Sequence, residues 1–336
     1  MSVMFHKVVS ACVGLLVAVV LLHPVDADAK SRTRKKARPS TSMRIKAVAA
    51  HRSVVRVEPE RASFGKLAGL HGADDPLDLK SSVALVLDQD TNEVLFSKNP
   101  EAVLPIASIT KLMTALVVVE AQQPLDEVLA ITQDDVDTEK HSSSRLAVGT
   151  RLTRGEMLHL ALMSSENRAA HALGRYYPGG LAVFVSKMNA KAAELGMKGT
   201  RYVEPTGLSS LNQSSAQDLA LLVKAAHQHE LIRQLSTSRE YQVAVGRRQM
   251  LFHTTNALVR SPSWDIGLQK TGYISEAGRC LVMQAQLAGR KLIMVLLDSA
   301  GKYSRIGDAE RIRKWVETHG VPATSPTAAT EPKLTS

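Results

Sequence analysis

Long apolar runs are scarce in this chain of 336 residues, and the only clear one lies at residues 8–22. Lys7 precedes it, and a short stretch that ends in small residues at Ala29 follows it. This pattern is typical of a secretory signal peptide, here residues 1–29, so we expect cleavage after Ala29 and export to the periplasm. Because no second run of that length follows, we expect the mature chain to be soluble.

Cysteine is also rare, with two residues in the whole chain. Cys12 lies within the predicted signal peptide, so the mature chain keeps only Cys280. A single thiol excludes an internal disulfide, and stability must come from the packed core. Since Cys280 lies in an apolar segment, we expect it to be packed and unreactive.

Acidic residues are absent from residues 30–56, although the chain as a whole carries a formal net charge of +10 at pH 7. This segment holds many Lys and Arg residues and has no apolar periodicity, which predicts a disordered basic tail. Such a tail could bind anionic wall polymers or membrane headgroups, or it could be a solvated spacer, and both interpretations stay open. Nucleic acid is not an expected partner of an exported chain.

Trimming both ends leaves about 240–255 residues, which is compatible with one large domain. We place this domain at residues 76–320. It would follow a tail and linker at residues 30–75 and precede a disordered C-terminal tail at residues 321–336.

Three short strings carry groups suited to acyl transfer: Ser108-Ile-Thr-Lys111, Ser165-Glu-Asn167 and Lys270-Thr-Gly272. Each is weak alone, since the pattern S-x-x-K recurs at Ser63 and Ser299. Together they supply a nucleophile, an amine base, a second hydroxyl and a cationic anchor for a carboxylate. Their combination therefore points to a serine acyl-transfer enzyme.

Ser108 lies where a helix is predicted to begin, because the run that follows has helical periodicity and no Gly or Pro. Backbone N–H groups at a helix start can help to stabilise an oxyanion. Lys111 follows three residues later on the same helical face, and burial would lower its pKa and make it a base for Ser108. A lysine snorkelling from a surface helix is the competing interpretation.

The second string falls between two predicted helices, with a break at Ser164 and Ser165. Ser165 and Asn167 would project from this turn, the hydroxyl to pass a proton and the amide to orient the substrate and Lys111. Alternatively, Ser165 is the N-cap of the following helix.

The third string lies on a strand that we expect at the edge of a sheet, facing a cleft, before two further strands at 281–288 and 291–298. Lys270 and Thr271 would hold a carboxylate, Gly272 would let a substrate backbone approach, and the N–H of Tyr273 would be an oxyanion donor. A solvated lysine before a turn is the alternative.

The strings SITKLMTAL, SSENRAA and KTGYISEAGRC resemble the active-site strings of the low-molecular-mass penicillin-binding proteins, most closely their endopeptidase branch. These are serine D-alanyl-D-alanine peptidases related to β-lactamases. EPTGLS at 204–209 and HTTNALV at 253–259 extend the likeness to roughly residues 80–316. The resemblance implies an α/β fold of the α+β type, with a mostly antiparallel five-stranded sheet packed against a helical region and a cleft between them. An N-terminal hairpin at 82–97 and a long helical middle fit that fold.

The resemblance also implies roles for the named residues and a substrate. Ser108 would be acylated, Lys111 would be its base, Ser165 and Asn167 would relay the proton and orient the substrate, and residues 270–272 would form the anchor strand. The expected activity is endopeptidase cleavage of peptidoglycan cross-links, without cofactor or metal. Stem peptides would be the substrates and β-lactam antibiotics the acylating inhibitors.

Four other functions would use some of the same features. A D-alanyl-D-alanine carboxypeptidase would use the same residues, whereas a β-lactamase usually needs an added glutamate, and no E-x-x-L-N string supplies one. A wall-binding module without turnover is also possible in principle. His71, Asp78, His227 and His229 loosely resemble the ligands of zinc peptidases, although their contexts suit turns and helix ends.

Overall fold

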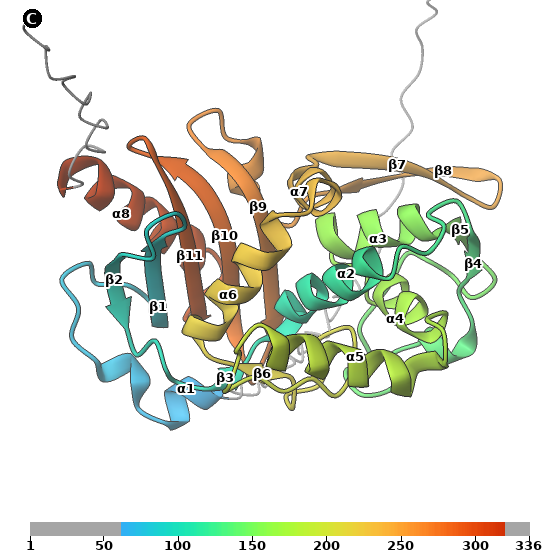
Figure 1. Cartoon of the computed structure of the whole chain (residues 1–336), viewed down its shortest axis with the longest axis horizontal. Helices are drawn as coiled ribbons and strands as arrows, with labels where there is room; N and C mark the ends of the chain where they lie inside the picture. The colour runs from blue at the N-terminus through green and yellow to red at the C-terminus, as the bar shows by residue number, and fades with distance from the viewer. Residues whose placement is uncertain (1–61, 320–336) are drawn as a thin grey trace, which may run out of the picture. The chain divides into compact units, whose positions relative to one another are not determined.

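The computed structural model describes residues 62–319, shown in Figure 1. The predicted signal peptide, the basic tail at residues 30–56 and the C-terminal tail at residues 321–336 lie outside these residues. The predicted linker extends too far, because α1 (Phe64–Leu67) and η1 (Leu70–Gly72) are helical. Ser63 caps α1 through its side chain, and the backbone N–H of Phe64 donates to Glu276 O at 2.9 Å, so local capping and a distant turn fix this segment.

A five-stranded sheet joins the two ends of the described chain, in the order β2-β1-β11-β10-β9 with every neighbouring pair antiparallel. The strands are β1 (Ser81–Asp88), β2 (Val94–Lys98), β9 (Asp265–Ile274), β10 (Gly278–Leu287) and β11 (Arg290–Ser299). This confirms the predicted fold, including the N-terminal hairpin and the edge position of β9. Ala288 and Gly289 both adopt positive φ, as a two-residue hairpin turn requires.

Both faces of the sheet are buried, so its central strands are apolar on both sides. In β1, Val83 and Leu85 face one core, while Ala84 and Val86 face the other. Helix α8 (Ser304–His319) covers the second face, and α6 (Ala216–His227) covers the first (Figure 1). The continuous apolar runs in the sequence thus follow from a sheet with helices on both sides.

A helical region lies beside the sheet, beyond its edge strand β9 (Figure 1). It consists of α2 (Thr110–Glu120), α3 (Arg154–Met163), α4 (Asn167–Arg175), α5 (Gly180–Glu194) and α7 (Glu230–Thr237). Helix α2 is buried along nearly its whole length because the other helices and the sheet surround it. None of the helices within residues 62–319 is long and apolar enough to cross a membrane.

Shorter elements complete the described chain. Among them, the strands at residues 240–253 correct the prediction of a long helical middle. Three two-stranded sheets pair β3 (Leu104–Pro105) with β6 (Gln213–Ser214), β4 (Val128–Ala130) with β5 (Arg151–Thr153), and β7 (Glu240–Val245) with β8 (Arg248–His253). Besides η1, the described residues form the 3-10 helices η2 (Ala107–Ile109), η3 (Gln133–Asp135) and η4 (Ala257–Arg260).

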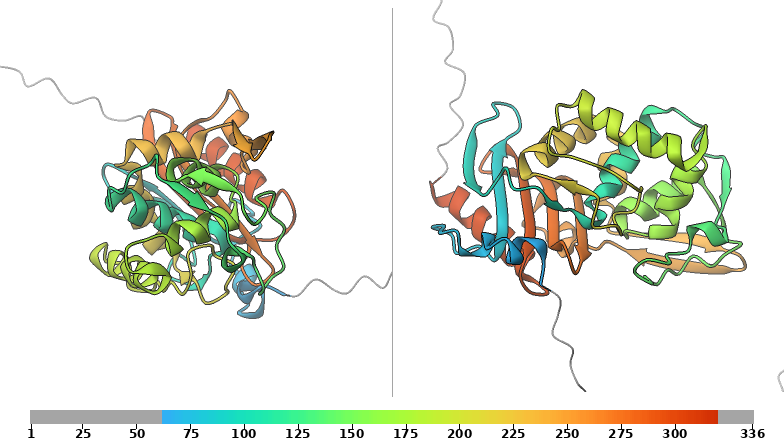
Figure 2. Two further views of the ribbon diagram at one scale, coloured as in Figure 1. Left: turned by 90° about the vertical axis from the view of Figure 1, so that its right-hand side faces the viewer. Right: turned by 90° about the horizontal axis from the view of Figure 1, so that it is seen from below.

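The hairpin of β7 and β8 lies along the helical region, as Figure 2 shows from below. Val243 and Phe252 are its two buried apolar anchors, and Gly246 turns the chain between the strands with φ +61°. Most of its other side chains are at least partly exposed, so the apolar signal of this hairpin in the sequence is weak.

Candidate active site

Ser108 lies in η2, the tight turn that leads directly into α2. The residue before it, Ala107, has φ +48°, a left-handed conformation that a residue with a Cβ seldom adopts. The hydroxyl of Thr110 donates to Ala107 O at 2.8 Å and stabilises this turn. Ser108 is half-buried at the start of a buried helix, as the sequence predicts.

Lys111 is fully buried, so the interpretation as a snorkelling surface lysine is wrong. Its Nζ lies 2.8 Å from Ser108 Oγ, 2.7 Å from Asn167 Oδ1 and 2.6 Å from Thr206 O. Burial lowers the pKa of Lys111 to about 7, although the negative charges of Glu204 and Glu166 oppose that shift. A large fraction of the side chain is therefore neutral near pH 7.

The contacts of Lys111 suit the neutral amine. Asn167 Oδ1 and Thr206 O can only accept hydrogen bonds, so they take the two N–H groups of a neutral amine. The nitrogen lone pair is then left for the hydroxyl of Ser108. The amide of Asn167 is fixed in this orientation because its Nδ2 donates to Ser142 Oγ at 2.9 Å.

Ser165 lies in the break between α3 and α4, as predicted, with φ +63°. Its hydroxyl accepts a hydrogen bond from Lys270 Nζ at 2.9 Å. The N-cap position of α4 belongs to Glu166 instead, so the interpretation of Ser165 as an N-cap is wrong. Glu166 accepts a hydrogen bond of 2.6 Å from Ser144 Oγ, which holds its carboxylate beside the site.

The β9 strand supplies the other wall of the site. Lys270 is fully buried, which contradicts a solvated lysine, and burial together with the charges of Lys111 and Arg305 lowers its pKa well below the usual value. Thr271 Oγ1 lies 2.6 Å from Thr255 Oγ1. A Cβ on Gly272 would lie 3.0 Å from the backbone nitrogen of Ser108, so glycine allows β9 to approach η2 closely.

Tyr273 follows on the same strand and is 44% exposed. The guanidinium carbon of Arg279, its cross-strand partner on β10, lies 4.3 Å from the centroid of the Tyr273 ring. The role of the Tyr273 N–H as an oxyanion donor stays a prediction. The structure thus brings together all three sequence strings, which are far apart along the chain.

The loop at residues 204–209 is part of the site, although sequence reasoning assigned it no role. Thr206 O bonds Lys111, and the carboxylate of Glu204 accepts from the backbone N–H groups of Thr206 and Gly207, at 2.6 Å each. Gly207 has φ +81°, and a Cβ there would lie 1.9 Å from Ala107 O. The signal in the sequence was Gly207, which follows Glu204 closely, but it did not reveal that Thr206 bonds Lys111, 95 positions earlier in the chain.

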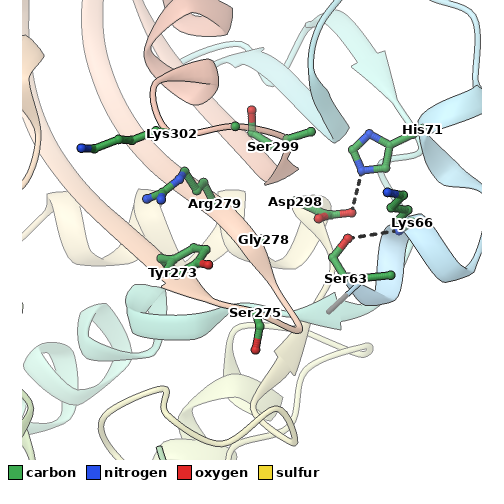
Figure 3. Close-up of a pocket in the computed structure, with 13 residues that line it drawn as sticks. Ser63, Lys66, His71, Tyr273, Ser275, Gly278, Arg279, Asp298, Ser299 and Lys302 are labelled. Carbon is green, nitrogen blue, oxygen red and sulfur yellow. Dashed lines mark hydrogen bonds and ion pairs between the residues drawn. The ribbon is translucent and has the colours of Figure 1, made fainter. Parts of the chain in front are cut away.

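The residues that loosely resemble zinc ligands each contact a different partner. His71 Nε2 lies 3.0 Å from Asp298 Oδ2 (Figure 3), Asp78 pairs with Lys80, and His227 Nδ1 lies 3.2 Å from Gln89 Nε2. Across residues 62–319, no three or more His, Cys, Asp or Glu side chains are grouped so that they could hold a metal ion. Cys280 is buried, and burial raises the pKa of its thiol to about 12, in line with inert packing.

Comparison with curated proteins gives relatives with a consistent function. The chain is 50% identical over 248 residues to the D-alanyl-D-alanine endopeptidase of Pseudomonas aeruginosa, covering 73% of this chain and 80% of that protein. It is 45% identical over 258 residues to the D-alanyl-D-alanine endopeptidase of Escherichia coli, covering 76% and 83%.

Solved structures agree with this similarity. The DD-transpeptidase of Streptomyces K15 matches with a TM-score of 0.66 at 26% identity, covering 70% of this chain and 97% of that one. Penicillin-binding protein D2 from Listeria monocytogenes, in its cefotaxime-bound form, matches with a TM-score of 0.64 at 28% identity, covering 72% and 98%. The model of the peptidase S11 family, described as D-alanyl-D-alanine carboxypeptidase, matches residues 71–301. With this match over more than half of its length, the chain belongs to the peptidase S11 family of D-alanyl-D-alanine peptidases.

Proposed function

We propose that this protein is a serine D-alanyl-D-alanine endopeptidase that hydrolyses peptide cross-links of peptidoglycan through an acyl-enzyme on Ser108. The observation that carries the proposal is the contact of 2.8 Å between Ser108 Oγ and a buried lysine whose pKa is about 7. The relatives with 45% and 50% identity are named endopeptidases, which favours this activity over others of the family.

In this mechanism, Ser108 Oγ attacks the carbonyl carbon of a D-alanine residue while its proton passes to Lys111 Nζ. The oxyanion rests on the backbone N–H groups of Ser108 and Tyr273, and loss of one such donor typically raises a barrier by ~3–4 kcal/mol. Ser165, held by Lys270, gives its proton to the leaving amine as the peptide C–N bond breaks, and it takes back the proton that Lys111 accepted from Ser108, so Lys111 is neutral again. Water then attacks the ester carbonyl and gives a proton to Lys111. That proton passes to Ser108 Oγ as the ester C–O bond breaks, which frees the carboxylic acid and restores the enzyme.

A carboxypeptidase would use the same residues in the same roles, so the geometry at Ser108 does not separate the two activities. Relatives named carboxypeptidases match at 33% identity or less among those compared, for example the one from Bacillus subtilis at 33%. A β-lactam antibiotic would acylate Ser108 in either case, in line with the cefotaxime-bound form of the Listeria neighbour.

We further propose that residues 1–29 direct export to the periplasm and are removed after Ala29. The basic residues at 30–56 would then bind an anionic wall polymer or membrane surface near the substrate. Both proposals rest on sequence alone.

Intact-mass spectrometry with benzylpenicillin tests the nucleophile. Residues 30–336 should gain a single persistent adduct, and the Ser108→Ala variant should gain none while it keeps its fold. An adduct on folded Ser108→Ala protein would place the nucleophile elsewhere, and no adduct on the wild type would refute the mechanism. Cleavage of cross-linked dimers in preference to linear pentapeptides would then separate the endopeptidase from the carboxypeptidase.

A further inference from the structure

A cavity of about 300 Å³ lies at one end of the sheet, outside the catalytic contacts described above (Figure 3). Its lining comes from three separate places: the segment of α1 and η1, the turn between β9 and β10, and the loop between β11 and α8. Its volume is at the lower end of the range for ligand pockets, enough for one small group of a larger substrate.

Three cationic side chains line this cavity without a carboxylate partner among residues 62–319: Lys66, Arg279 and Lys302. Its one lining carboxylate, Asp298, has a side chain that is only 3% exposed and is bonded by His71 at 3.0 Å and by Ser82 Oγ at 2.9 Å. The acidic charge is thus already engaged within the protein, and the cavity keeps an excess of positive charge.

The position of Arg279 suits recognition of an anion. The contact with the ring of Tyr273 constrains the guanidinium group, which presents a planar set of N–H donors. Such a fork matches the geometry of a carboxylate or phosphate group better than an ammonium does. In Figure 3, Arg279 and Lys302 lie at one side of the cavity, and Lys66 lies at the other.

The cavity also adjoins the site of Ser108. Tyr273 lines it and directly follows Gly272, whose backbone lies against the backbone nitrogen of Ser108. A peptide that runs along β9 with its carbonyl carbon at Ser108 therefore passes the cavity within one or two residues.

We propose that this cavity is a subsite for a carboxylate-bearing residue of the cross-linked peptide, with Arg279 and Lys302 as its recognition groups. The proposal rests on the proposed function for the identity of the substrate. Free phosphate has the same chemistry, so the experiment must separate a peptide carboxylate from a free anion.

Equilibrium binding to Ser108→Ala protein tests the subsite without turnover. A cross-linked peptide with free carboxylates should bind about tenfold more tightly than the same peptide with those carboxylates amidated. Adding Arg279→Ala and Lys302→Ala should remove most of this preference, and the part that remains belongs to the carboxylate contact expected at Lys270 and Thr271. Lys187→Ala, at an exposed lysine on α5, should retain it and controls for the loss of a positive charge.

Equal binding of the two peptides by the parent protein, or an unchanged preference in the Arg279 and Lys302 variant, would overturn the subsite. Inorganic phosphate should compete with the peptide that carries free carboxylates and weaken its binding to Ser108→Ala protein. It should not do so in the variant that also lacks Arg279 and Lys302. If phosphate binds through Arg279 while both peptides bind equally, the cavity takes a free anion and the peptide assignment is wrong. Failure of the wild type to cleave cross-links would instead count against the proposed function, because binding is measured on the inactive variant.

Discussion

Replacing Glu204 by Gln should shift the pH dependence of acylation at Ser108 toward lower pH. In the proposed mechanism the neutral form of Lys111 is the base. Because its pKa is about 7, the acylation rate should rise with pH through about 7 and then level off. Burial lowers this pKa, and the charge of Glu204 is the larger of two opposing influences. Without that charge the ammonium form is less stable, so the neutral form persists to lower pH.

The size of the shift follows from the position of the two charges. Lys111 Nζ and a carboxylate oxygen of Glu204 each bond the backbone of Thr206, at its carbonyl and its N–H. Two unit charges about 7 Å apart interact by roughly 2 kcal/mol at an effective dielectric constant of about 20, which corresponds to about one to two pH units. We therefore expect the midpoint of the acid limb to fall by about that amount.

The assay is the second-order rate constant of acylation by benzylpenicillin, measured from about pH 5 to about pH 9. Glu166→Gln provides a second test, because Glu166 is held by Ser144 and forms no hydrogen bond with the 204–209 loop. It should shift the limb in the same direction by a smaller amount. A limb that stays in place in both variants, or moves to higher pH, would refute the assignment of the limb to Lys111.

Two further changes test the framework around the site. Burial raises the pKa of Asp135, but hydrogen bonds from its partners, including Arg175, outweigh it and lower the pKa from 3.8 to about 2. The carboxylate therefore stabilises the fold above pH 3.8, and that stabilisation is lost as pH falls toward 2. In urea unfolding at neutral pH, Asp135→Asn should lower the free energy of unfolding by about 2 kcal/mol. Asp134→Asn, at an exposed neighbouring residue, should change it little. Gly207→Ala should lower acylation by about a hundredfold through displacement of the nucleophile turn. Gly246→Ala, which has φ +61° but open space around it, carries only the backbone strain, so equal losses of acylation in both variants would contradict this explanation.

Local signals in the sequence were sufficient wherever the relevant partners are close along the chain. The spacing of Ser108 and Lys111 places the two side chains together on one turn, and their contact of 2.8 Å confirms it. The strands β10 and β11 were also predictable, because each is a run of about ten apolar-rich residues and they are joined by a two-residue turn.

Features that depend on distant partners were not predictable in this way. Val243 and Phe252 carry most of the burial of the β7 and β8 hairpin, so its sequence lacks a clear alternating pattern. α1 was assigned to a linker because the bond from Phe64 N–H to Glu276 O depends on the completed sheet. Likewise, the carbonyl of Thr206 bonds Lys111 across a sequence separation of 95 residues.

The backbone of the turn that contains Ser108 is in close contact with two segments that are distant in sequence. Ala107 is strained at φ +48° and is approached closely from two directions. A Cβ on Gly207 would collide with the carbonyl oxygen of Ala107, and a Cβ on Gly272 would lie 3.0 Å from the Cβ of Ala107. Neither glycine lies near η2 in sequence, yet each lets a separate strand or loop approach the same residue. The strain at Ala107 persists because the packed surroundings fix the backbone there, as is common at functional sites. Close backbone packing from two distant segments therefore fixes the position of Ser108 beside Lys111, before any substrate is bound.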